Sequence, residues 1–518
     1  MANVTCRICA TWGMWATMSR ATLLALAALA GCSDRPGTHT SVVMIVADTL
    51  RADALLDPVW QSATPNLDRL AEDGLFFSQC FAHAPMTLPS HAALFSSRLP
   101  HQSGVLVNGQ AVDAELPLLA EYLSERNFET RAAVSIATLW PSAPGAGLDR
   151  GFANFVNPPQ EVAPGPALNA QLLPLLDGLS SDRNFFLLAH YSDPHQPWNA
   201  HGTEGHSARL TLDGAELATL PTSEATWWES ELELTPGEHE LLVASDAMFR
   251  LRRIRVDGPD AAPALLDETD LTPTLERSFL LTIPPGPPVR RTLRLWVHDA
   301  PGPDEIRARY AHEVRALDSA VGELLDALKE RGLYEDTIIL FTADHGEGLG
   351  EHGTIGHVQH LHRELLHVPL ILKLPAGQAL PAGLAQAKQT LVPQIDLVPT
   401  LIDLLGLPPL PGAVGRSLLE PGPRVLMAET HRPEAARDLF CLRDTECLMV
   451  FEPAADRFQV FDLLADPAET HDLGSAGLGL RPAWPQRLRR AAASPAFQER
   501  APAILDAETE ARLRALGY

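Results

Sequence analysis

The sequence predicts an α/β fold built on a central, mostly parallel sheet with helices on both sides. Two continuous runs rich in β-branched residues, Ser41–Ala47 and Asp336–Ala343, have the composition of strands buried on both faces. A third apolar run, Asn184–Ala189, has the same form. Each run leads into side chains that can bind a metal ion or exchange a proton. Because ligands of open α/β sheets bind outside the carboxyl ends of the strands, we expect a functional site at that edge.

A long amphipathic helix is expected just before the Asp336–Ala343 strand. Asp304 is suited to cap its start, and Gly332 is suited to end it. Between them the apolar residues keep a helical period at Ile306, Tyr310, Val314, Leu317, Val321, Leu324, Leu325 and Leu328. Helices of this kind therefore lie between the buried strands.

Two regions depart from this pattern. Residues 201–302 contain short alternating stretches such as Leu293–Val297, and turn dipeptides at Pro236-Gly237 and Asp257-Gly258, which together predict an inserted β-sandwich. After about Gln394, Pro-rich loops and short strands predict a smaller α+β region. The expected organisation is a signal segment at 1–32, a discontinuous α/β domain at 40–200 and 303–393, the insertion at 201–302, and a C-terminal subdomain at 394–518.

Length and charge limit the classes of function. A chain of 518 residues is long enough for more than one hydrophobic core. Its 40 Lys and Arg against 65 Asp and Glu give a formal net charge of −25. Such a surface repels nucleic-acid backbones and anionic lipid, so we expect no nucleic-acid partner. The sequence gives no prediction of oligomeric state.

The N-terminal segment has the pattern of an export signal. An apolar run, Ala21–Ala30, is too short to span a bilayer and has the length of a signal-peptide core. The end of the segment, Leu29-Ala30-Gly31-Cys32, resembles a bacterial lipoprotein signal, in which Cys32 is acylated and becomes the first mature residue. An ordinary cleaved signal peptide is the alternative. We therefore expect a lipid-anchored protein, secreted across the inner membrane, in the periplasm or on the outer membrane.

Two cysteines near the C-terminus are expected to form a disulfide. Cys441 and Cys447 bracket a predicted hairpin turn at Arg443–Thr445. An oxidising periplasm would permit a bridge between them.

The segment Met86–Leu94 carries a candidate nucleophile. Pro89 fits the first turn of a helix, and the residues after it are good helix formers. Thr87 would then lie just before a helix N-terminus, where unpaired N–H groups and the helix dipole favour negative charge. A threonine alkoxide would be stabilised there, and more so beside a divalent cation. An ordinary capping threonine is the alternative.

Two strand-end carboxylates indicate such a cation. Asp48 follows the first buried strand, and Asp344-His345 follows the Asp336–Ala343 strand. The two carboxylates would repel each other unless a cation lay between them. Hard oxygen ligands with one imidazole suit Ca²⁺, Mn²⁺ or Zn²⁺, and ligand type alone does not select among them.

These motifs together resemble the sulfatase family of the alkaline-phosphatase superfamily. The Met86–Leu94 segment follows the family's Cys/Ser-x-Pro-Ser-Arg signature, with Thr87 at the Cys or Ser position and His91 at the Arg. The segment that begins at Asp344-His345 matches the family's Asp-Asn or Asp-His pair after a strand and the glycine-rich stretch that leads to a Lys or His, here His357. Other family-like segments are Asp193–His195, His367–Leu370, Gln394–Thr400, Asp462–Pro467 and the terminal Leu-Gly-Tyr.

The resemblance implies an alkaline-phosphatase-like fold and a set of site residues. Asp48, Thr87, Asp344 and His345 would surround one divalent metal ion, for which the resemblance favours Ca²⁺. It also implies that His195 and His357 contact the leaving group or the transferred oxyanion. His352 is a further catalytic candidate, and His91 occupies a substrate-binding position. For each of these histidines a structural role is the alternative.

Two departures from the family affect the expected chemistry. Ala47 precedes Asp48 where the family usually has a second Asp, and Thr87 cannot be oxidised to the formylglycine that the family makes from Cys or Ser. A threonine can still attack directly. Water must then open the covalent intermediate, which phosphorus tolerates more readily than sulfur.

We therefore expect a metal-dependent hydrolase of sulfate- or phosphate-type esters, acting on a small-molecule or glycan substrate. The alternatives are a phosphodiesterase or phosphoryl-group transferase of the same superfamily, or an inactive binding protein with the sulfatase fold.

Overall fold

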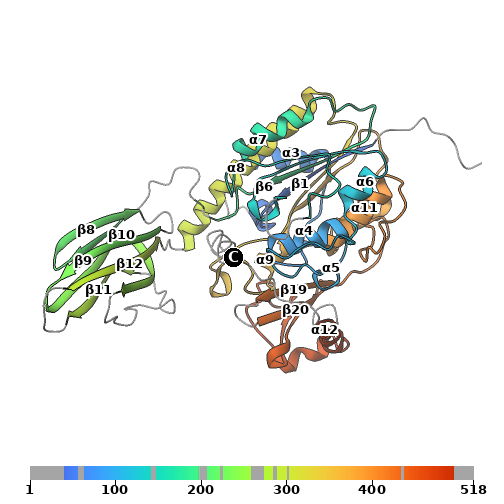
Figure 1. The fold of residues 1–518 in the computed structure, drawn as a ribbon. Helices are drawn as coiled ribbons and strands as arrows, with labels where there is room; N and C mark the ends of the chain where they lie inside the picture. Colours follow the sequence, from blue (N-terminus) through green and yellow to red (C-terminus); the bar gives the residue numbers. More distant parts are fainter. Residues whose placement is uncertain are drawn as a thin grey trace, which may run out of the picture. The chain divides into compact units, whose positions relative to one another are not determined.

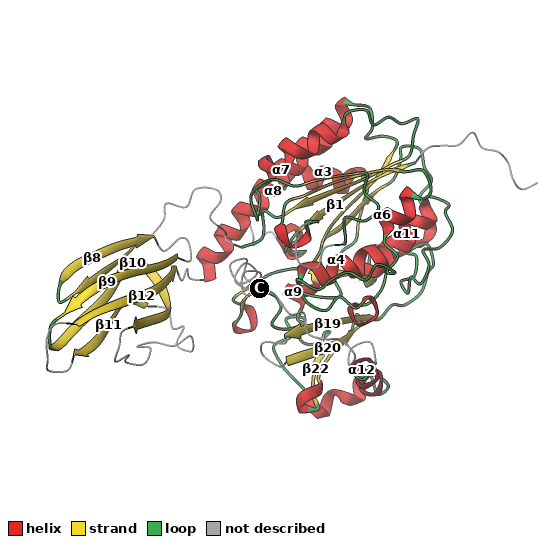
Figure 2. Cartoon of the chain, viewed as in Figure 1, coloured by secondary structure: helices red, strands yellow, loops and turns green. Residues whose placement is uncertain are grey.

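The computed structural model describes residues 40–56, 64–141, 147–196, 198, 207–221, 226–257, 274–283, 289–299, 303–432 and 437–494. The predicted lipoprotein signal with Cys32 lies outside these residues. Among the described helices, none is both long enough and apolar enough to cross a membrane. Figure 2 shows helices, strands and loops along the chain.

The predicted α/β fold is confirmed by a seven-stranded sheet. Its strand order is β2-β17-β13-β1-β6-β4-β5. The strands comprise Leu75–Phe76 (β2), Leu370–Lys373 (β17), Thr337–Ala343 (β13), Ser41–Ala47 (β1), Phe185–Tyr191 (β6), Glu129–Val134 (β4) and Asn154–Val156 (β5). β1 lies in the centre and runs parallel to both β13 and β6. The pairs β13–β17 and β17–β2 are antiparallel, so the sheet is mostly parallel.

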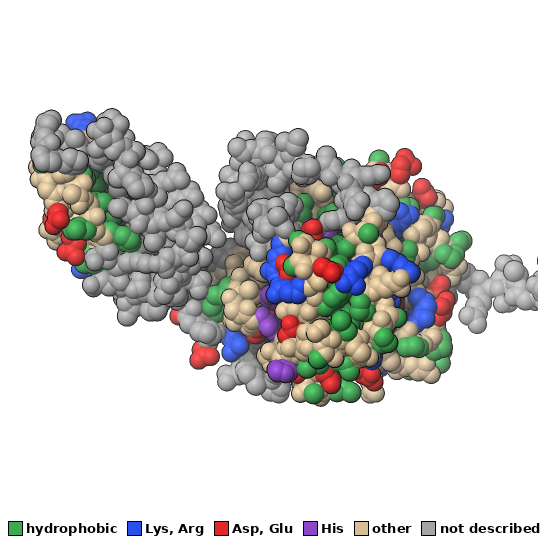
Figure 3. All heavy atoms as spheres, turned by 90° about the horizontal axis from the view of Figure 1, so that it is seen from below, with side chains coloured by type: hydrophobic (Ala, Val, Ile, Leu, Met, Phe, Trp, Pro, Cys, Tyr) green, Lys and Arg blue, Asp and Glu red, His purple; other side chains and the backbone are tan. Residues whose placement is uncertain are grey.

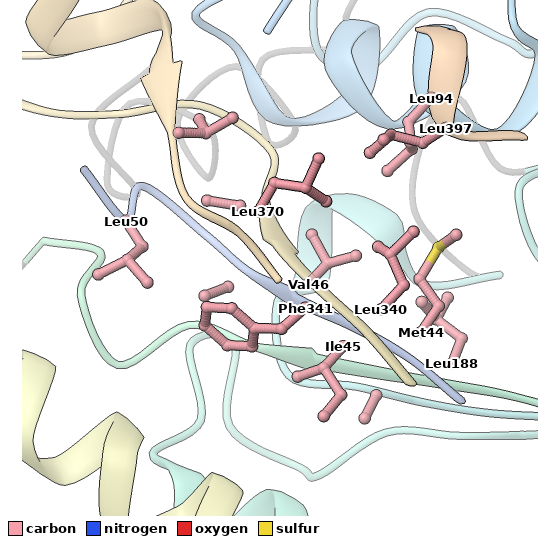
Figure 4. Close-up of a cluster of buried hydrophobic side chains, with 14 of the residues drawn as sticks. Met44, Ile45, Val46, Leu50, Leu94, Leu188, Leu340, Phe341, Leu370 and Leu397 are labelled. Carbon is pink, nitrogen blue, oxygen red and sulfur yellow. The ribbon is translucent and has the colours of Figure 1, made fainter. Parts of the chain in front are cut away.

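The central strands are apolar because both of their faces are covered. Every residue of β1, β6 and β13 is buried. Figure 4 shows Met44, Ile45 and Val46 of β1 beside Leu340 and Phe341 of β13. Burying a leucine- or isoleucine-sized side chain stabilises the fold by roughly 1.5–3 kcal/mol, so this cluster contributes strongly to folding.

Two groups of helices cover the sheet (Figure 1). One group contains α3 (Pro65–Asp73), α7 (Gly165–Leu172) and α8 (Pro303–Glu330), and both α3 and α7 pack against α8. The other contains α4 (Thr87–Ser96), α6 (Leu119–Ser124) and α11 (Leu397–Leu404), and both α6 and α11 pack against α4. The predicted helix over 304–332 is confirmed as α8, which ends before Gly332 with its positive φ of 68°.

The inserted region forms antiparallel strands, as the alternation of residues predicted. The strands are Ser207–Leu212 (β7), Ala215–Pro221 (β8), Thr226–Leu234 (β9), Gly237–Asp257 (β10), Thr274–Ile283 (β11) and Val289–Asp299 (β12). The first part of β10 pairs with β7 and β11, and the part after Phe249 pairs with β12. Nine buried residues form a separate hydrophobic cluster there, among them Leu210, Leu241 and Leu293. That this region folds as an independent sandwich domain remains a prediction.

The C-terminal region is built on a four-stranded antiparallel sheet. Its strands are Leu426–Arg432 (β19), Arg437–Arg443 (β20), Cys447–Glu452 (β21) and Arg457–Asp462 (β22), and α12 (Trp484–Ala492) packs against β20 and β21. The predicted hairpin between Cys441 and Cys447 is confirmed, but the predicted disulfide is wrong, because both thiols are free and buried. Cys441 belongs to the main core cluster and Cys447 to the cluster that includes Trp484 of α12, so the two side chains point to opposite faces of the sheet.

The surface does not carry a field of one sign on the face shown in Figure 3. Lys and Arg side chains lie there among Asp and Glu, and histidine side chains also reach the surface. Despite the net charge of −25, charge alone does not single out a binding region on this face.

Candidate metal centre and active site

Two aspartates meet at the carboxyl ends of the central strands. Ala47 and Ala343 are register partners in the β1–β13 pair, so Asp48 and Asp344, the next residues, leave the sheet side by side. Both side chains are fully buried. Asp344 Oδ1 accepts hydrogen bonds from the backbone N–H of Thr49 (3.1 Å) and of His345 (2.7 Å), which fixes the direction of this carboxylate. The parallel sheet therefore brings together two groups that are 296 positions apart in the sequence.

His345 completes a three-residue group. Its Nε2 lies 3.5 Å from Asp344 Oδ2 and 3.9 Å from Asp48 Oδ1. Its Nδ1 donates to the carbonyl of Gly346 at 2.9 Å, so Nε2 carries the lone pair. One ligand atom from each of the three residues lies within 4.8 Å of the others.

The group has buried polar atoms that no protein group satisfies. Both carboxylate oxygens of Asp48, Oδ2 of Asp344 and Nε2 of His345 have no hydrogen-bond partner among the described residues. Buried polar atoms without partners are costly, and here they converge on one point. Two carboxylates and one imidazole are the ligands that a divalent cation takes in proteins, so the residues present fit the metal ion that the fold implies.

The ionisation of these groups favours the same interpretation. Burial raises the pKa of Asp48 well above its usual range, and the neighbouring Asp344 and Glu347 raise it further. Burial also raises the pKa of Asp344 to about 6. Burial lowers the pKa of His345 to about 3, so its imidazole is neutral and able to bind a metal. A cation would remove the carboxylate repulsion that these pKa values reflect.

Thr87 is the first residue of α4, whereas the sequence predicted it just before the helix. Its side chain is fully buried. The first turn of α4 is fixed against the end of β13, because Ser90 Oγ donates to the carbonyl of Asp344 at 2.6 Å. His91 Nδ1 lies 2.8 Å from the Thr87 carbonyl and 3.6 Å from Asp344 Oδ2. The positive end of the α4 dipole therefore meets the buried carboxylates at Thr87.

His357 and Glu347 face each other across a short hairpin. Gly348 in β14 (Gly348–Leu349) pairs with Gly356 in β15 (Ile355–Gly356), which places the residues on either side of this pair together. His357 Nδ1 lies 3.1 Å from Glu347 Oε1. A Cβ atom on Gly348 would lie 2.8 Å from the Gly356 carbonyl oxygen, so the close approach of the strands requires glycine.

The histidine rings connect this hairpin to the metal group. The ring of His357 lies 4.7 Å from that of His345 and 5.4 Å from that of His195, measured between centroids. Burial lowers the pKa of His357 to about 3 and that of His195 to about 4. His195 Nδ1 donates to the Gln196 carbonyl at 2.6 Å, so Nε2 is the nitrogen that can exchange a proton or bind a ligand. Burial raises the pKa of Glu347 to about 7.

Three residues near this group were missed by the sequence reasoning. His190, the sixth residue of β6, has Nε2 4.0 Å from Asp48 Oδ2 and lies beside His91, with ring centroids 4.9 Å apart. Glu347 follows the Asp-His pair by two residues. His190 directly follows the apolar run Asn184–Ala189, and Glu347 belongs to the segment that begins at Asp344-His345. Their closeness to the ends of buried strands was the signal that could have indicated them. Asn108 Oδ1 accepts from the Leu88 N–H at 2.9 Å, and no pattern in the sequence indicated it.

The contacts of His352 lead away from this group. Its Nδ1 lies 2.6 Å from Glu364 Oε1, and its Nε2 donates to the Glu469 carbonyl at 3.0 Å. Its ring stacks on that of His362, with centroids 3.8 Å apart. The structure therefore links Asp48, Asp344, His345, His91, His195 and His357 by contacts at the strand ends, with Thr87 joined to them through His91, and joins His352 to a second cluster.

Comparison with known proteins agrees with the resemblance found in the sequence. The family model described as Sulfatase matches residues 40–407. A multifunctional alkaline phosphatase superfamily protein, PehA of Trinickia caryophylli, is 25% identical, over 84% of this chain and 91% of its own length. A choline-sulfatase of Rhizobium meliloti is 25% identical, over 84% of this chain and 82% of its own length. A phosphonate monoester hydrolase of Agrobacterium radiobacter has the same fold, with a TM-score of 0.58, 20% identity, and coverage of 88% of this chain and 95% of that chain.

Proposed function

The chain belongs to the sulfatase family and is a hydrolase, and we propose that it cleaves sulfate- or phosphoryl-type esters by direct attack of an unmodified Thr87. The observation that carries this proposal is the position of Thr87. It is a fully buried residue at the start of α4, in a turn that Ser90 and His91 fix against Asp344. Choline-sulfatase, N-acetylglucosamine-6-O-sulfatase and phosphonate monoester hydrolase are among the relatives, which supports both ester types and a small-molecule or glycan substrate.

We assign the metal to Asp48, Asp344 and His345, with Thr87 beside it. When bound, a divalent cation would polarise the ester and favour the ionised form of a nearby hydroxyl. The resemblance favours Ca²⁺, whereas the imidazole ligand also suits Mn²⁺ or Zn²⁺. The protein contributes the position of its ligands, because the Asp344 carboxylate is held by two backbone N–H groups and His345 by the Gly346 carbonyl.

Attack by Thr87 would form a bond from its Oγ to sulfur or phosphorus and break the bond to the leaving-group oxygen. The proton of the hydroxyl must pass to a base. His91 lies one helical turn further along α4, and burial lowers the pKa of His91, so its imidazole is neutral. Its Nε2 has no hydrogen-bond partner among the described residues and can accept a proton. Threonine gives no aldehyde, so water must then open the covalent ester, which favours a phosphoryl substrate.

The leaving group requires a proton in the same step. We assign its delivery to Glu347 and His357 because Glu347 is the acid of the site with a pKa of about 7, raised by burial. His357 would give its Nε2 proton to the leaving-group oxygen and take the Glu347 proton at Nδ1, across the 3.1 Å contact. Glu347 is left as a carboxylate, and the protons balance. His195, whose ring contacts that of His357, would bind the substrate or its leaving group.

The test is a comparison of Thr87→Ala with Thr87→Ser on matched aryl sulfate, phosphate monoester, phosphate diester and phosphonate ester substrates, with Ca²⁺, Mn²⁺ or Zn²⁺ added. Thr87→Ala should lose roughly three orders of magnitude or more in kcat, as is typical when a nucleophile is removed. Thr87→Ser should keep measurable turnover, since it retains a hydroxyl.

Mass spectrometry should find Thr87 at its unmodified mass. Turnover by Thr87→Ala at the wild-type rate would refute attack by the threonine. A wild-type preference for sulfate over every phosphorus ester would refute the phosphoryl preference alone.

We also propose that the protein is exported and anchored through an acylated Cys32, on the strength of the Leu29–Cys32 pattern.

A further inference from the structure

We propose that His352, His360 and Glu364 form a second divalent-metal site of the transition-metal class, separate from the site at the strand ends. His352 lies in the hairpin segment between β14 and β15, and His360 follows that segment. Glu364 belongs to α9 (Arg363–Leu366). One ligand atom from each of the three residues lies within 4.8 Å of the others.

The distances between the ligand atoms are close to those that a zinc ion needs. Tetrahedral zinc with bonds of about 2.0–2.1 Å separates neighbouring ligand atoms by about 3.4 Å. His360 Nε2 and Glu364 Oε1 are 3.5 Å apart. His352 Nδ1 and Glu364 Oε1 are 2.6 Å apart, a hydrogen bond that an ion would replace with a small movement of the imidazole. Thr354 Oγ1, 2.8 Å from His360 Nε2, lies beside the same point.

The surrounding residues orient His352 as an outer shell orients a metal ligand. A carbonyl oxygen only accepts, so the contact from Nε2 to the Glu469 carbonyl places a proton on Nε2 and directs Nδ1 to Glu364. The His352 ring is stacked on His362, which contacts Glu469 Oε2 at 3.0 Å through Nδ1. Loading gives up existing contacts: the hydrogen bond of His352 Nδ1 with Glu364, that of His360 Nε2 with Thr354 Oγ1, and one at His360 Nδ1. The His362 N–H donates to His360 Nδ1 at 3.4 Å, and this long bond would be given up.

The ligand set indicates a transition metal. Two imidazoles and one carboxylate suit zinc, nickel or copper, whereas calcium takes six to eight oxygens. Six of the 19 histidines lie in the segment from His345 to His367, both ends included, and histidine-rich tracts are typical of metal binding. The His352 side chain is 18% exposed while that of Glu364 is 3% exposed, so an ion can enter from the His352 side.

An ion at this site would stiffen the hairpin that carries the catalytic pair. Glu347 and His357 lie at the two ends of the hairpin, and His352 lies between them in the chain. Glu364 is next to Leu365, whose carbonyl accepts from the Gly346 N–H at 2.9 Å. The ion would therefore join the hairpin to α9 and, through α9, to the backbone of the strand-end motif.

The experiment counts zinc ions in the full-length chain after removal of metal with a chelator. Asp344→Asn removes a ligand of the strand-end site, and the resulting protein should still bind one zinc by equilibrium dialysis and elemental analysis. Adding His360→Gln or Glu364→Gln should weaken that zinc at least about 100-fold, because even an outer-shell substitution costs about 10–100-fold. His312→Ala, on the exposed part of α8, is the matched control and should keep the zinc. Co²⁺ loading gives an independent readout through its visible absorption.

Circular dichroism verifies that each variant is folded, and Asp48→Asn replaces Asp344→Asn if the latter is not. Failure of the folded single variant to bind zinc would overturn the proposal. Unchanged zinc affinity after Glu364→Gln would also overturn it. In that case the cluster serves only as a network of hydrogen bonds and ion pairs. Neither result bears on Thr87 or the strand-end metal.

Discussion

Replacing Asp344 with asparagine should stabilise the metal-free protein and remove the stabilisation that Ca²⁺ gives to the wild type. The substituted amide has the same shape, and its oxygen can still accept from the Thr49 and His345 N–H groups. Its NH₂ group would take the place of Oδ2, 3.5 Å from His345 Nε2, and gain an acceptor. The change therefore removes a buried charge without removing the hydrogen bonds that position the side chain.

The magnitude follows from the pKa of Asp344. A rise from 3.8 to about 6 corresponds to ~3 kcal/mol at 1.36 kcal/mol per pKa unit. A carboxyl whose folded pKa is raised loses stability as pH rises, because the unfolded chain ionises first. The advantage of Asp344→Asn should thus be near zero below pH 3.8, grow towards pH 6, and stay at ~3 kcal/mol above it. In a chain of this size such a change moves Tm by several degrees.

The assay is thermal unfolding of chelator-treated wild type and Asp344→Asn at pH 8, with and without Ca²⁺. Ca²⁺ at 100 times its Kd should stabilise the wild type by about 2.7 kcal/mol and the variant hardly at all, because the two imidazoles and one carboxylate of the His352 cluster do not suit calcium. Asp318→Asn, which alters a buried acidic residue of α8 away from the site, is the control and should keep the response to metal. A metal-free variant less stable than wild type at pH 8 would refute the charge argument. Equal stabilisation of both proteins by metal would refute the ligand assignment.

Three further predictions concern the leaving-group acid, the anchor and the insertion. Wild-type kcat should fall as pH rises through about 7, the pKa of Glu347. Glu347→Gln should lose this fall in kcat at high pH and about 10²-fold in kcat itself. A variant with the same pH profile as the wild type would contradict the assignment of Glu347. Cys32→Ala should release the protein from the membrane fraction, and unchanged retention would exclude acylation at this residue. Replacing residues 201–302 with a short Gly/Ser linker should leave a folded protein that still binds metal, whereas loss of soluble protein would make the insertion integral to the fold.

The sequence predicted the central sheet because its signals are local and strong. Ser41–Ala47 became β1 with the predicted bounds, and the other two apolar runs became β6 and β13 within a few residues. Such runs are informative because a strand covered on both faces admits few polar residues. The α8 helix was equally clear, since its apolar positions keep one period over 28 residues.

The failures have a different physical origin. The disulfide was predicted from spacing along the chain, but pairing depends on which face of the sheet each residue occupies. Cys441 lies opposite Val450, and Cys447 lies opposite Asp462. His190 and Asn108 were missed because a site side chain needs only one suitable position, and a single polar residue leaves no periodic pattern. Such residues become visible only when the register of the strands and the packing of the loops are known.

The substitutions that separate this chain from the family pattern near the strand ends change the charge that is buried there. Where the resemblance has a second Asp and an Arg, this chain has Ala47 and His91. The pKa values of His91 and His357 are lowered by burial, so neither adds positive charge at neutral pH. Asp48 and Asp344 still bring two carboxylates into a buried site. The charge of Arg51 lowers the pKa of Glu347, but Arg51 is itself paired with Asp53. Relative to the family pattern the site has thus lost one carboxylate and one fixed cation, and the two carboxylates that remain would be neutralised by the divalent ion that we propose.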